Sequence, residues 1–166
     1  MASSEYDRST TATSLEGLPD PIREAIVAHA RARMITLQPD AHAFVTHSRR
    51  LRKPGLLARM TGSGDYDAEH LTALVLGPRD LLVGTHGTER GTAVLSARLE
   101  DVGLDSLTLA PAGDGMSVSG FGTSVEGQPR VGSFYVGLGE PAGEDAREAL
   151  REAVRVARAA ERGWRD

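Results

Sequence analysis

The sequence contains no cysteine among its 166 residues. This absence excludes disulfide bonds, thiolate zinc sites, iron–sulfur clusters and cysteine nucleophiles, and it favours a reducing cytoplasm as the location. No apolar run approaches the length of about 18 residues that a membrane-spanning helix needs. The first residues show neither the basic nor the apolar stretch of a secretory signal, so we expect no signal peptide. The sequence therefore predicts a soluble, cytoplasmic protein.

Aromatic residues and lysine are also scarce. The chain has three Phe, three Tyr and one Trp, and Lys53 is the only lysine among 19 basic residues. Leu, Val and Ala must therefore supply most of the core. The formal net charge is −4 and the isoelectric point is about 5.7, which disfavours nucleic acid as a general partner.

The length and the 40% apolar content suffice for one domain. Residues 1–17 are rich in Ser and Thr and hold few large apolar side chains. Such a segment buries too little surface to offset the entropy of ordering it. We therefore expect a disordered tail over 1–17 and a single domain over 18–163.

One amphipathic helix is predicted near each end of that domain. The first begins near Asp20, whose carboxylate is expected to cap it ahead of a proline, and its apolar stripe runs to about residue 34. The second covers 143–161, where acidic residues crowd the start and arginines crowd the end, as the helix dipole favours. Gly163 is expected to stop this helix.

Short β-like runs separated by turn residues fill the sequence between the helices. Runs at 71–76 and 81–85 flank Gly77–Asp80, where a proline at the second turn position predicts a tight antiparallel hairpin. Residues 84–91 are predicted to form another turn. Further strands are predicted at 41–46, 92–99, 102–110, 115–121 and 131–138.

Such short connections favour antiparallel pairing, because parallel strands need crossovers of about a dozen residues. The predicted fold class is therefore α+β. We expect a curled antiparallel sheet or open barrel of roughly six to seven strands. The amino-terminal helix and a capping carboxy-terminal helix should cover it.

Three segments resemble bacterial pleckstrin-homology-like (PH-like) domains: 74–83 (LVLGPRDLLV), 94–102 (VLSARLEDV) and 133–138 (SFYVGL). The first is similar to their strand–turn–strand unit, with an arginine in the turn and a Leu-Leu pair after it. The last is similar to their final strand, which runs into the closing helix. The resemblance covers roughly residues 40–160 and implies a binding domain that holds ligands with loops at the open end of the barrel.

The main candidate site is residues 48–60, which hold five basic residues and no acidic one. The segment is expected to be a loop, and its leucines could lie on an anionic membrane or on an acidic partner. Each Lys or Arg near an anionic leaflet contributes about 1 kcal/mol. The charge is also segregated: nine basic and six acidic residues over 1–60 give +3, whereas 61–166 carry −7. The candidate partner-binding or anion-binding residues are Arg49, Arg50, Arg52, Lys53 and Arg59.

We therefore expect a non-enzymatic binding or scaffolding module that needs no cofactor and contacts a protein partner through this basic segment. An anionic membrane surface is the alternative partner, and a mobile, solvated loop without function is a further interpretation. Nucleic acid is disfavoured, because the run offers no aromatic ring for a base to stack on. Val156 and Ala160 widen the apolar stripe of the last helix and leave self-association open, while Trp164 is expected to pack back onto the domain.

The alternative function is a small metal-dependent hydrolase. Imidazole and carboxylate groups can ligate a metal ion together, although these residues lack the tight paired spacing of zinc motifs. No Gly-x-Ser-x-Gly element points to a serine nucleophile. The candidate residues for this alternative are His47, His70 and His86 with Asp65, Asp67 and Glu69.

Overall fold

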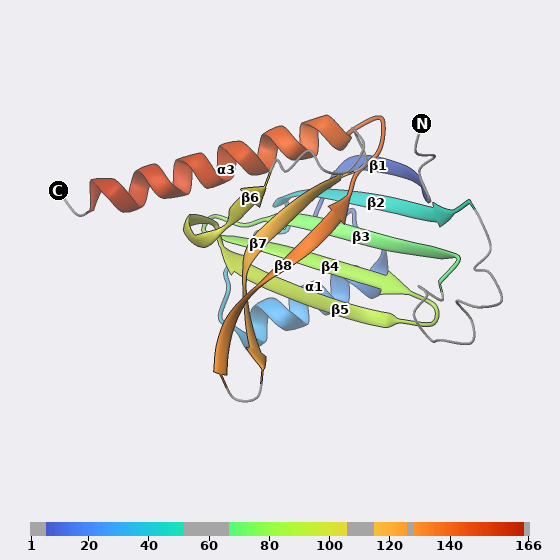
Figure 1. Ribbon diagram of the computed structural model, residues 1–166, viewed down its shortest axis with the longest axis horizontal. Helices are drawn as coiled ribbons and strands as arrows, with labels where there is room; N and C mark the ends of the chain where they lie inside the picture. Colours follow the sequence, from blue (N-terminus) through green and yellow to red (C-terminus); the bar gives the residue numbers. More distant parts are fainter. Residues whose placement is uncertain (1–5, 52–66, 106–114, 126–127, 165–166) are drawn as a thin grey trace.

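The computed structural model describes residues 6–51, 67–105, 115–125 and 128–164. In these residues two antiparallel sheets and two α-helices are joined in one chain (Figure 1). The helices are Asp20–Ala32 (α1) and Gly143–Gly163 (α3), and Leu99–Asp101 (η1) forms a 3₁₀ turn. The five-stranded sheet contains, in spatial order, Tyr6–Ser14 (β1), His42–Arg50 (β2), Glu69–Leu76 (β3), Asp80–Gly87 (β4) and Gly91–Arg98 (β5). The three-stranded sheet contains Gly103–Asp105 (β6), Gly115–Val125 (β7) and Gln128–Gly137 (β8).

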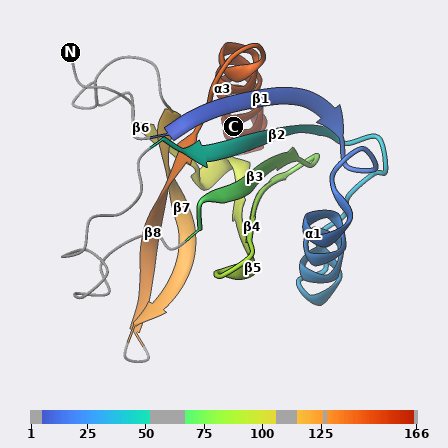
Figure 2. The same cartoon turned by 90° about the vertical axis from the view of Figure 1, so that its right-hand side faces the viewer.

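The middle of the five-stranded sheet is covered on both faces. On one face α1 packs its apolar stripe, led by Ile22 and Ile26, against β2, β3 and β4. On the other face Phe44 and its neighbours meet the inner side chains of β7 and β8, and Leu150 of α3 closes this second core. Figure 2 shows α1 and the β7–β8 hairpin on opposite sides of the sheet. Each large apolar side chain buried in this way contributes roughly 1.5–3 kcal/mol.

The predicted α+β class and the antiparallel pairing are confirmed. The hairpin around Gly77–Asp80 pairs Leu76 with Leu81, and strands lie where 41–46, 92–99, 115–121 and 131–138 predicted them. The described residues contain eight strands in two sheets and no closed barrel, so the estimate of six to seven strands was low. Of the strand predicted over 102–110, only Gly103–Asp105 is seen, and 106–110 lie outside the described residues.

The prediction of a disordered segment over 1–17 is wrong for Tyr6–Ser14. These residues form β1, which pairs along its whole length with β2, from Tyr6 opposite Arg50 to Ser14 opposite His42. The threonines that lowered the apolar content are β-branched and favour extended backbone. Residues 1–5 lie outside the described part of the chain.

The predicted helix ends and caps are shifted by one or two residues. Pro19 takes the N-cap position of α1, and Asp20 instead forms an ion pair with Arg23 at 2.6 Å. Gly163 lies inside α3, and Trp164 takes the C-cap position. Trp164 is 90% exposed, so the prediction that it packs back onto the domain is wrong. The carboxy-terminal end of α3 extends past both sheets (Figure 1).

The predicted turn over 84–91 is mostly strand. Residues Gly84–Gly87 belong to β4, and Thr88–Arg90 alone connect it to β5. Gly84 lies directly beneath α1, where a Cβ atom would stand 2.9 Å from Ile22 Cγ1. The absence of a side chain at Gly84 therefore allows α1 to pack closely on the sheet, and this glycine does not form a turn. Of the helices in the described residues, neither has the length and apolarity to cross a membrane.

Candidate functional site

The basic segment 48–60 is not a loop throughout. Ser48, Arg49 and Arg50 belong to β2, and an exposed Leu51 follows them. Successive side chains of a strand point to opposite faces, so Arg49 and Arg50 diverge. The remaining predicted site residues, Arg52, Lys53 and Arg59, lie outside the described residues.

Arg49 lies on the exposed end of the face that α1 covers further along the sheet. Its Nη2 atom lies 3.6 Å from Asp7 Oδ2, and both side chains are about 60% exposed. On the same face His47 Nε2 lies 3.3 Å from Glu69 Oε2. Exposed ion pairs of this kind contribute only about 0–1 kcal/mol each. Arg49 therefore has an acidic neighbour on the protein itself.

Arg50 lies on the other face, where β1 brings Tyr6 directly opposite it. The guanidinium carbon of Arg8 lies 5.0 Å from the centroid of the Tyr6 ring, and that of Arg50 lies 5.7 Å from it. The ring of His70 meets Tyr6 edge-on at 5.6 Å. We call Tyr6, Arg8, Arg50 and His70 the tyrosine–arginine cluster. Guanidinium groups attracted to an aromatic face contribute roughly 0.5–1 kcal/mol each at exposed sites, so the ring helps to orient both arginines.

A groove of about 530 Å³ borders this cluster. Its walls come from the start of β1, from Leu51, from the connection between β8 and α3, and from the first turns of α3. We call it the β1–α3 groove. Within it, Arg147 Nη1 lies 3.0 Å from Glu144 Oε2, and Arg147 Nη2 donates to the carbonyl of Gly115 at 3.3 Å. The charged residues that line the groove are Asp7, Arg8, Glu140, Glu144 and Arg147.

Thr10 holds β1 against the wall of this groove. Its amide donates to the carbonyl of Glu140 at 3.2 Å, and its carbonyl accepts from the amide of Ala142 at 3.1 Å. The amide of Gly139 donates to Thr10 Oγ1 at 2.9 Å. A Cβ atom on Gly139 or Gly137 would clash with Arg8. These two glycines therefore give Arg8 the space to lie against the β8–α3 connection.

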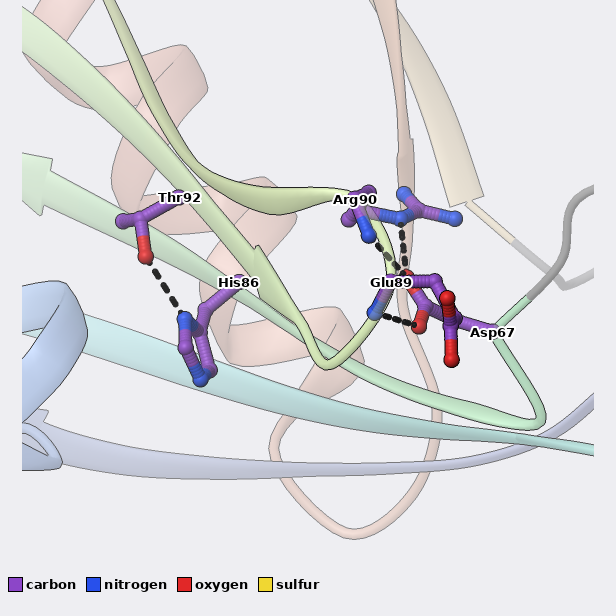
Figure 3. Close-up of polar contacts among 5 residues, drawn as sticks. All are labelled: Asp67, His86, Glu89, Arg90 and Thr92. Atoms are coloured by element: carbon purple, nitrogen blue, oxygen red, sulfur yellow. Dashed lines mark hydrogen bonds and ion pairs between the residues drawn. The ribbon is translucent and has the colours of Figure 1, made fainter.

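Among the described histidines and carboxylates of the hydrolase hypothesis, His47 and Glu69 lie 3.3 Å apart, and no third ligand joins them. His47 and His86 share a face, but Leu71 of β3 lies between them in register, which separates their backbones by about 9–10 Å. His70 belongs to the opposite face and contacts Tyr6. His86 Nδ1 instead lies 2.6 Å from Thr92 Oγ1 (Figure 3). Over 6–51, 67–105, 115–125 and 128–164, no three metal-ligating side chains gather, and Asp65 lies outside these residues.

Asp67, another residue of that hypothesis, has a structural role. Its buried carboxylate accepts hydrogen bonds from the amides of Glu89 at 2.6 Å and Arg90 at 3.2 Å, and from Arg90 Nε at 3.0 Å (Figure 3). Burial raises the pKa of Asp67, but the amide hydrogen bonds and the Arg90 guanidinium outweigh it, so the pKa lies below its ordinary value. Asp67 thereby closes the β4–β5 turn.

Tyr6 and Arg8 were missed because sequence reasoning assigned them to a tail. The signal that could have revealed them is the alternation of Tyr6, Arg8 and Thr10 with smaller polar residues, which has the period of a strand. Comparison of the chain with family models, with curated protein sequences and with solved structures gave no match. The resemblance to PH-like domains therefore rests on the sequence segments alone.

Proposed function

We propose that this chain is a non-enzymatic, cytoplasmic binding module that recognises an acidic segment of a protein partner. The proposed binding surface is the tyrosine–arginine cluster, which contains Arg50 of the basic segment 48–60. The observation that carries the proposal is the placement of Arg8 and Arg50 at 5.0 and 5.7 Å from one tyrosine ring, at the border of a groove of about 530 Å³.

The chemistry of the cluster suits a carboxylate. A guanidinium group binds a carboxylate through parallel N–H donors, and such charge-assisted bonds are about twice as strong as neutral ones. When an aromatic ring lies against the flat face of a guanidinium group, the N–H donors point outward from the edges of that group. Leu51, which is 55% exposed beside the groove, adds an apolar contact.

A protein partner suits this surface better than a membrane does. Asp7, Glu140 and Glu144 line the same groove as Arg8. These carboxylates would repel a continuous layer of anionic headgroups, whereas they can pair with basic side chains of a partner that also carries acidic ones. Mixed charge therefore favours a partner with a defined sequence of charges.

The order of elements supports a PH-like arrangement as part of this proposal. Strands β2–β5 form one antiparallel run, β6–β8 form a second, and α3 follows directly and covers the core between them. In PH-like domains, loops at the open end of the sheets hold ligands. The basic segment starts within β2 at Ser48, and β2 ends at Arg50.

The test compares Arg50→Glu with Arg49→Glu. The two variants change the charge equally at adjacent positions on opposite faces of β2. We expect Arg50→Glu to weaken binding of a short fluorescein-labelled polyglutamate peptide, measured by fluorescence anisotropy, by about tenfold or more, which corresponds to the loss of one charge-assisted contact. Arg49→Glu should weaken it by less than about threefold.

Two results would overturn the proposal. One is equal loss in both variants, which would indicate a diffuse charge effect. The other is binding to phosphatidylglycerol-containing vesicles, followed by flotation, together with no measurable binding of the peptide. That result would assign the surface to a membrane instead.

A further inference from the structure

The edge of β5 is the second feature of the molecule that can take a ligand. β5 ends the five-stranded sheet, with β4 on its one paired side. The amide of Leu99 donates to the carbonyl of Arg79 at 2.9 Å. Leu99 and Arg79 are therefore a hydrogen-bonded pair, directly before the first pair of the β4–β5 ladder. Since hydrogen-bonded and non-hydrogen-bonded pairs alternate along an antiparallel ladder, the backbone groups of Val94, Ser96 and Arg98 point away from β4.

Nothing in the described part of the chain pairs with this edge. Among the described residues no strand lies beyond β5 in the sheet, and the backbone groups of Val94, Ser96 and Arg98 form no backbone–backbone hydrogen bond outside it. The β4–β5 register runs without a bulge, and β5 contains no proline. Natural proteins use bulges and prolines to block strand edges, so this edge keeps its capacity to accept another strand.

A groove of about 810 Å³ lies at the carboxy-terminal end of this edge, and we call it the β5 groove. Ser96, Ala97 and Arg98 form part of its lining. Residues 33–36 after α1 line one side, and Gly120 and Gly122 of β7 line the other. Figure 2 shows β5 between α1 and the β7–β8 hairpin, with its edge turned away from the rest of the sheet.

The wall formed by β7 leaves space for a polypeptide backbone. A Cβ atom on Gly122 would meet no atom within 4 Å. Gly120 has a φ of +110° at the irregularity between Ser119 and Phe121, a conformation that side-chain-bearing residues rarely adopt. Glycines in a strand often mark the place where another backbone approaches closely. At Gly120 that backbone belongs to Asp101 and Val102 of this chain, so the open space in the wall lies at Gly122.

The charges at one end of the groove indicate which segment fits. Arg33 and Arg79 line it, and neither forms an ion pair with a residue of the described chain. Arg98 lies 3.0 Å from Glu100 and is already neutralised. Asp80 and Asp101 also line the groove, so its charge is mixed. The guanidinium groups without an ion pair to a described residue are those of Arg33, which follows α1, and Arg79, which lies in the β3–β4 turn.

We propose that β5 binds an extended peptide segment of a protein partner as an additional antiparallel strand. The segment spans about five residues. Its first, third and fifth residues pair with the three outward-facing residues of β5, which are Arg98, Ser96 and Val94. An acidic side chain of the segment lies at Arg33 and Arg79. This site is separate from the tyrosine–arginine cluster, since β1 and β5 form opposite edges of the sheet.

The experiment removes one edge donor without touching the pairing to β4. In Ser96→Pro the lost N–H points into the groove, while Leu95 and Ala97 keep their bonds to β4. Ser96→Ala is the matched control, because it keeps the amide and loses the hydroxyl that lies 2.8 Å from His29 Nε2. The probe is a fluorescein-labelled peptide of alternating valine and threonine residues flanked by aspartates. A second peptide of the same sequence carries N-methyl groups on alternate amides.

We expect the unmodified peptide to bind the wild-type protein and the Ser96→Ala variant with the same affinity. Its affinity for Ser96→Pro should be about tenfold lower or weaker still. The N-methylated peptide should lose affinity for the wild-type protein by the same factor. Arg79→Glu should weaken binding by about fivefold. In ¹H–¹⁵N spectra of the wild type, the amide signals of Ser96 and Arg98 should shift on binding. This measurement, with the N-methylated peptide, keeps the proposal testable should Ser96→Pro not fold.

The proposal is overturned by equal binding of the two peptides, by unchanged Ser96 and Arg98 signals, or by no binding at all. It is also overturned if the edge pairs with a second copy of the chain, which light scattering would show as a dimer that Ser96→Pro dissociates. None of these results depends on Arg50, so they leave the function proposed for the tyrosine–arginine cluster unaffected.

Discussion

The hydroxyl groups of Thr10 and Thr46 lie 2.8 Å apart between β1 and β2, and both side chains are buried. Thr10 Oγ1 also accepts the amide hydrogen of Gly139 at 2.9 Å, so its own hydrogen is available for Thr46. One side chain thus connects β1, β2 and the β8–α3 connection. Because Arg8 lies two residues away on the same face of β1, this connection also positions the tyrosine–arginine cluster.

Thr10→Val should lower the free energy of unfolding by about 2 kcal/mol, because it leaves the partly buried Gly139 amide and the buried Thr46 hydroxyl without their partner. Thr46→Val should cost about 1 kcal/mol. The double variant should lose less than the two single losses combined, because the residues share one hydrogen bond. Urea unfolding of the four proteins checks this, and strict additivity would show that the hydroxyls act independently.

The position of β1 shows where sequence reasoning stops. A segment of nine residues with one buried threonine has almost no local hydrophobic signal, and its strand character comes from pairing with β2 about 36 residues later. The hairpin around Gly77–Asp80 and the helix α3 were predictable, because turn chemistry and helical periodicity are local properties. The partner of an edge strand is not a local property.

The same reason explains how much of the site could be predicted. Charge density identified Arg50 within the basic segment. Only the register of β1 with β2 shows that it faces Tyr6 while Arg49 faces Asp7. Asp67 had the residue type of a metal ligand, and the structure assigns it to the β4–β5 turn through contacts more than 20 residues away in sequence.

Met34 offers a second prediction, because it has a φ of +55° after the end of α1. Its amide bonds to the carbonyl of Arg31 at 3.2 Å and that of Ile35 bonds to Ala30 at 2.8 Å, the pattern of a Schellman motif that normally has glycine at this position. Met34→Gly should therefore raise the free energy of unfolding by about 0.5–1 kcal/mol. Urea midpoints measure it, and Ala32→Gly inside α1 should lower stability by a similar amount. A loss in both variants would contradict the strain argument.

Gly84 supports a third prediction, on the packing of α1 against the sheet. A Cβ atom there would lie 2.9 Å from Ile22 Cγ1 and 3.0 Å from Ile26 Cδ1, so these isoleucine side chains or α1 itself must shift. We expect Gly84→Ala to cost about 1–2 kcal/mol, measured by thermal or urea unfolding. Gly122→Ala is the control, since its Cβ would meet nothing and should change stability by less than about 0.5 kcal/mol. Equal losses in the two variants would contradict the packing argument, because removing glycine flexibility from the unfolded chain stabilises the fold.

The fourth prediction concerns acid stability and depends on Asp67. Burial raises the pKa of this carboxyl, but the amides of Glu89 and Arg90 and the Arg90 guanidinium lower it further than burial raises it. A carboxyl whose pKa is lower in the folded than in the unfolded state stabilises the fold above the unfolded value of about 3.9. That contribution is lost as the pH falls through the lower, folded pKa.

Asp67→Asn should therefore lower the free energy of unfolding by about 2–3 kcal/mol at neutral pH, because a neutral side-chain amide replaces a charged acceptor of three hydrogen bonds. Urea unfolding at neutral pH and near pH 3 should show the difference from wild type shrinking at the acidic end, because below about pH 3.9 this carboxyl is protonated in the unfolded chain. Asp101→Asn, at an exposed position, should stay within about 0.5 kcal/mol of wild type at both pH values. A constant difference between Asp67→Asn and wild type across this pH range would mean that the shape of the Asp67 side chain, and not its charge, closes the β4–β5 turn.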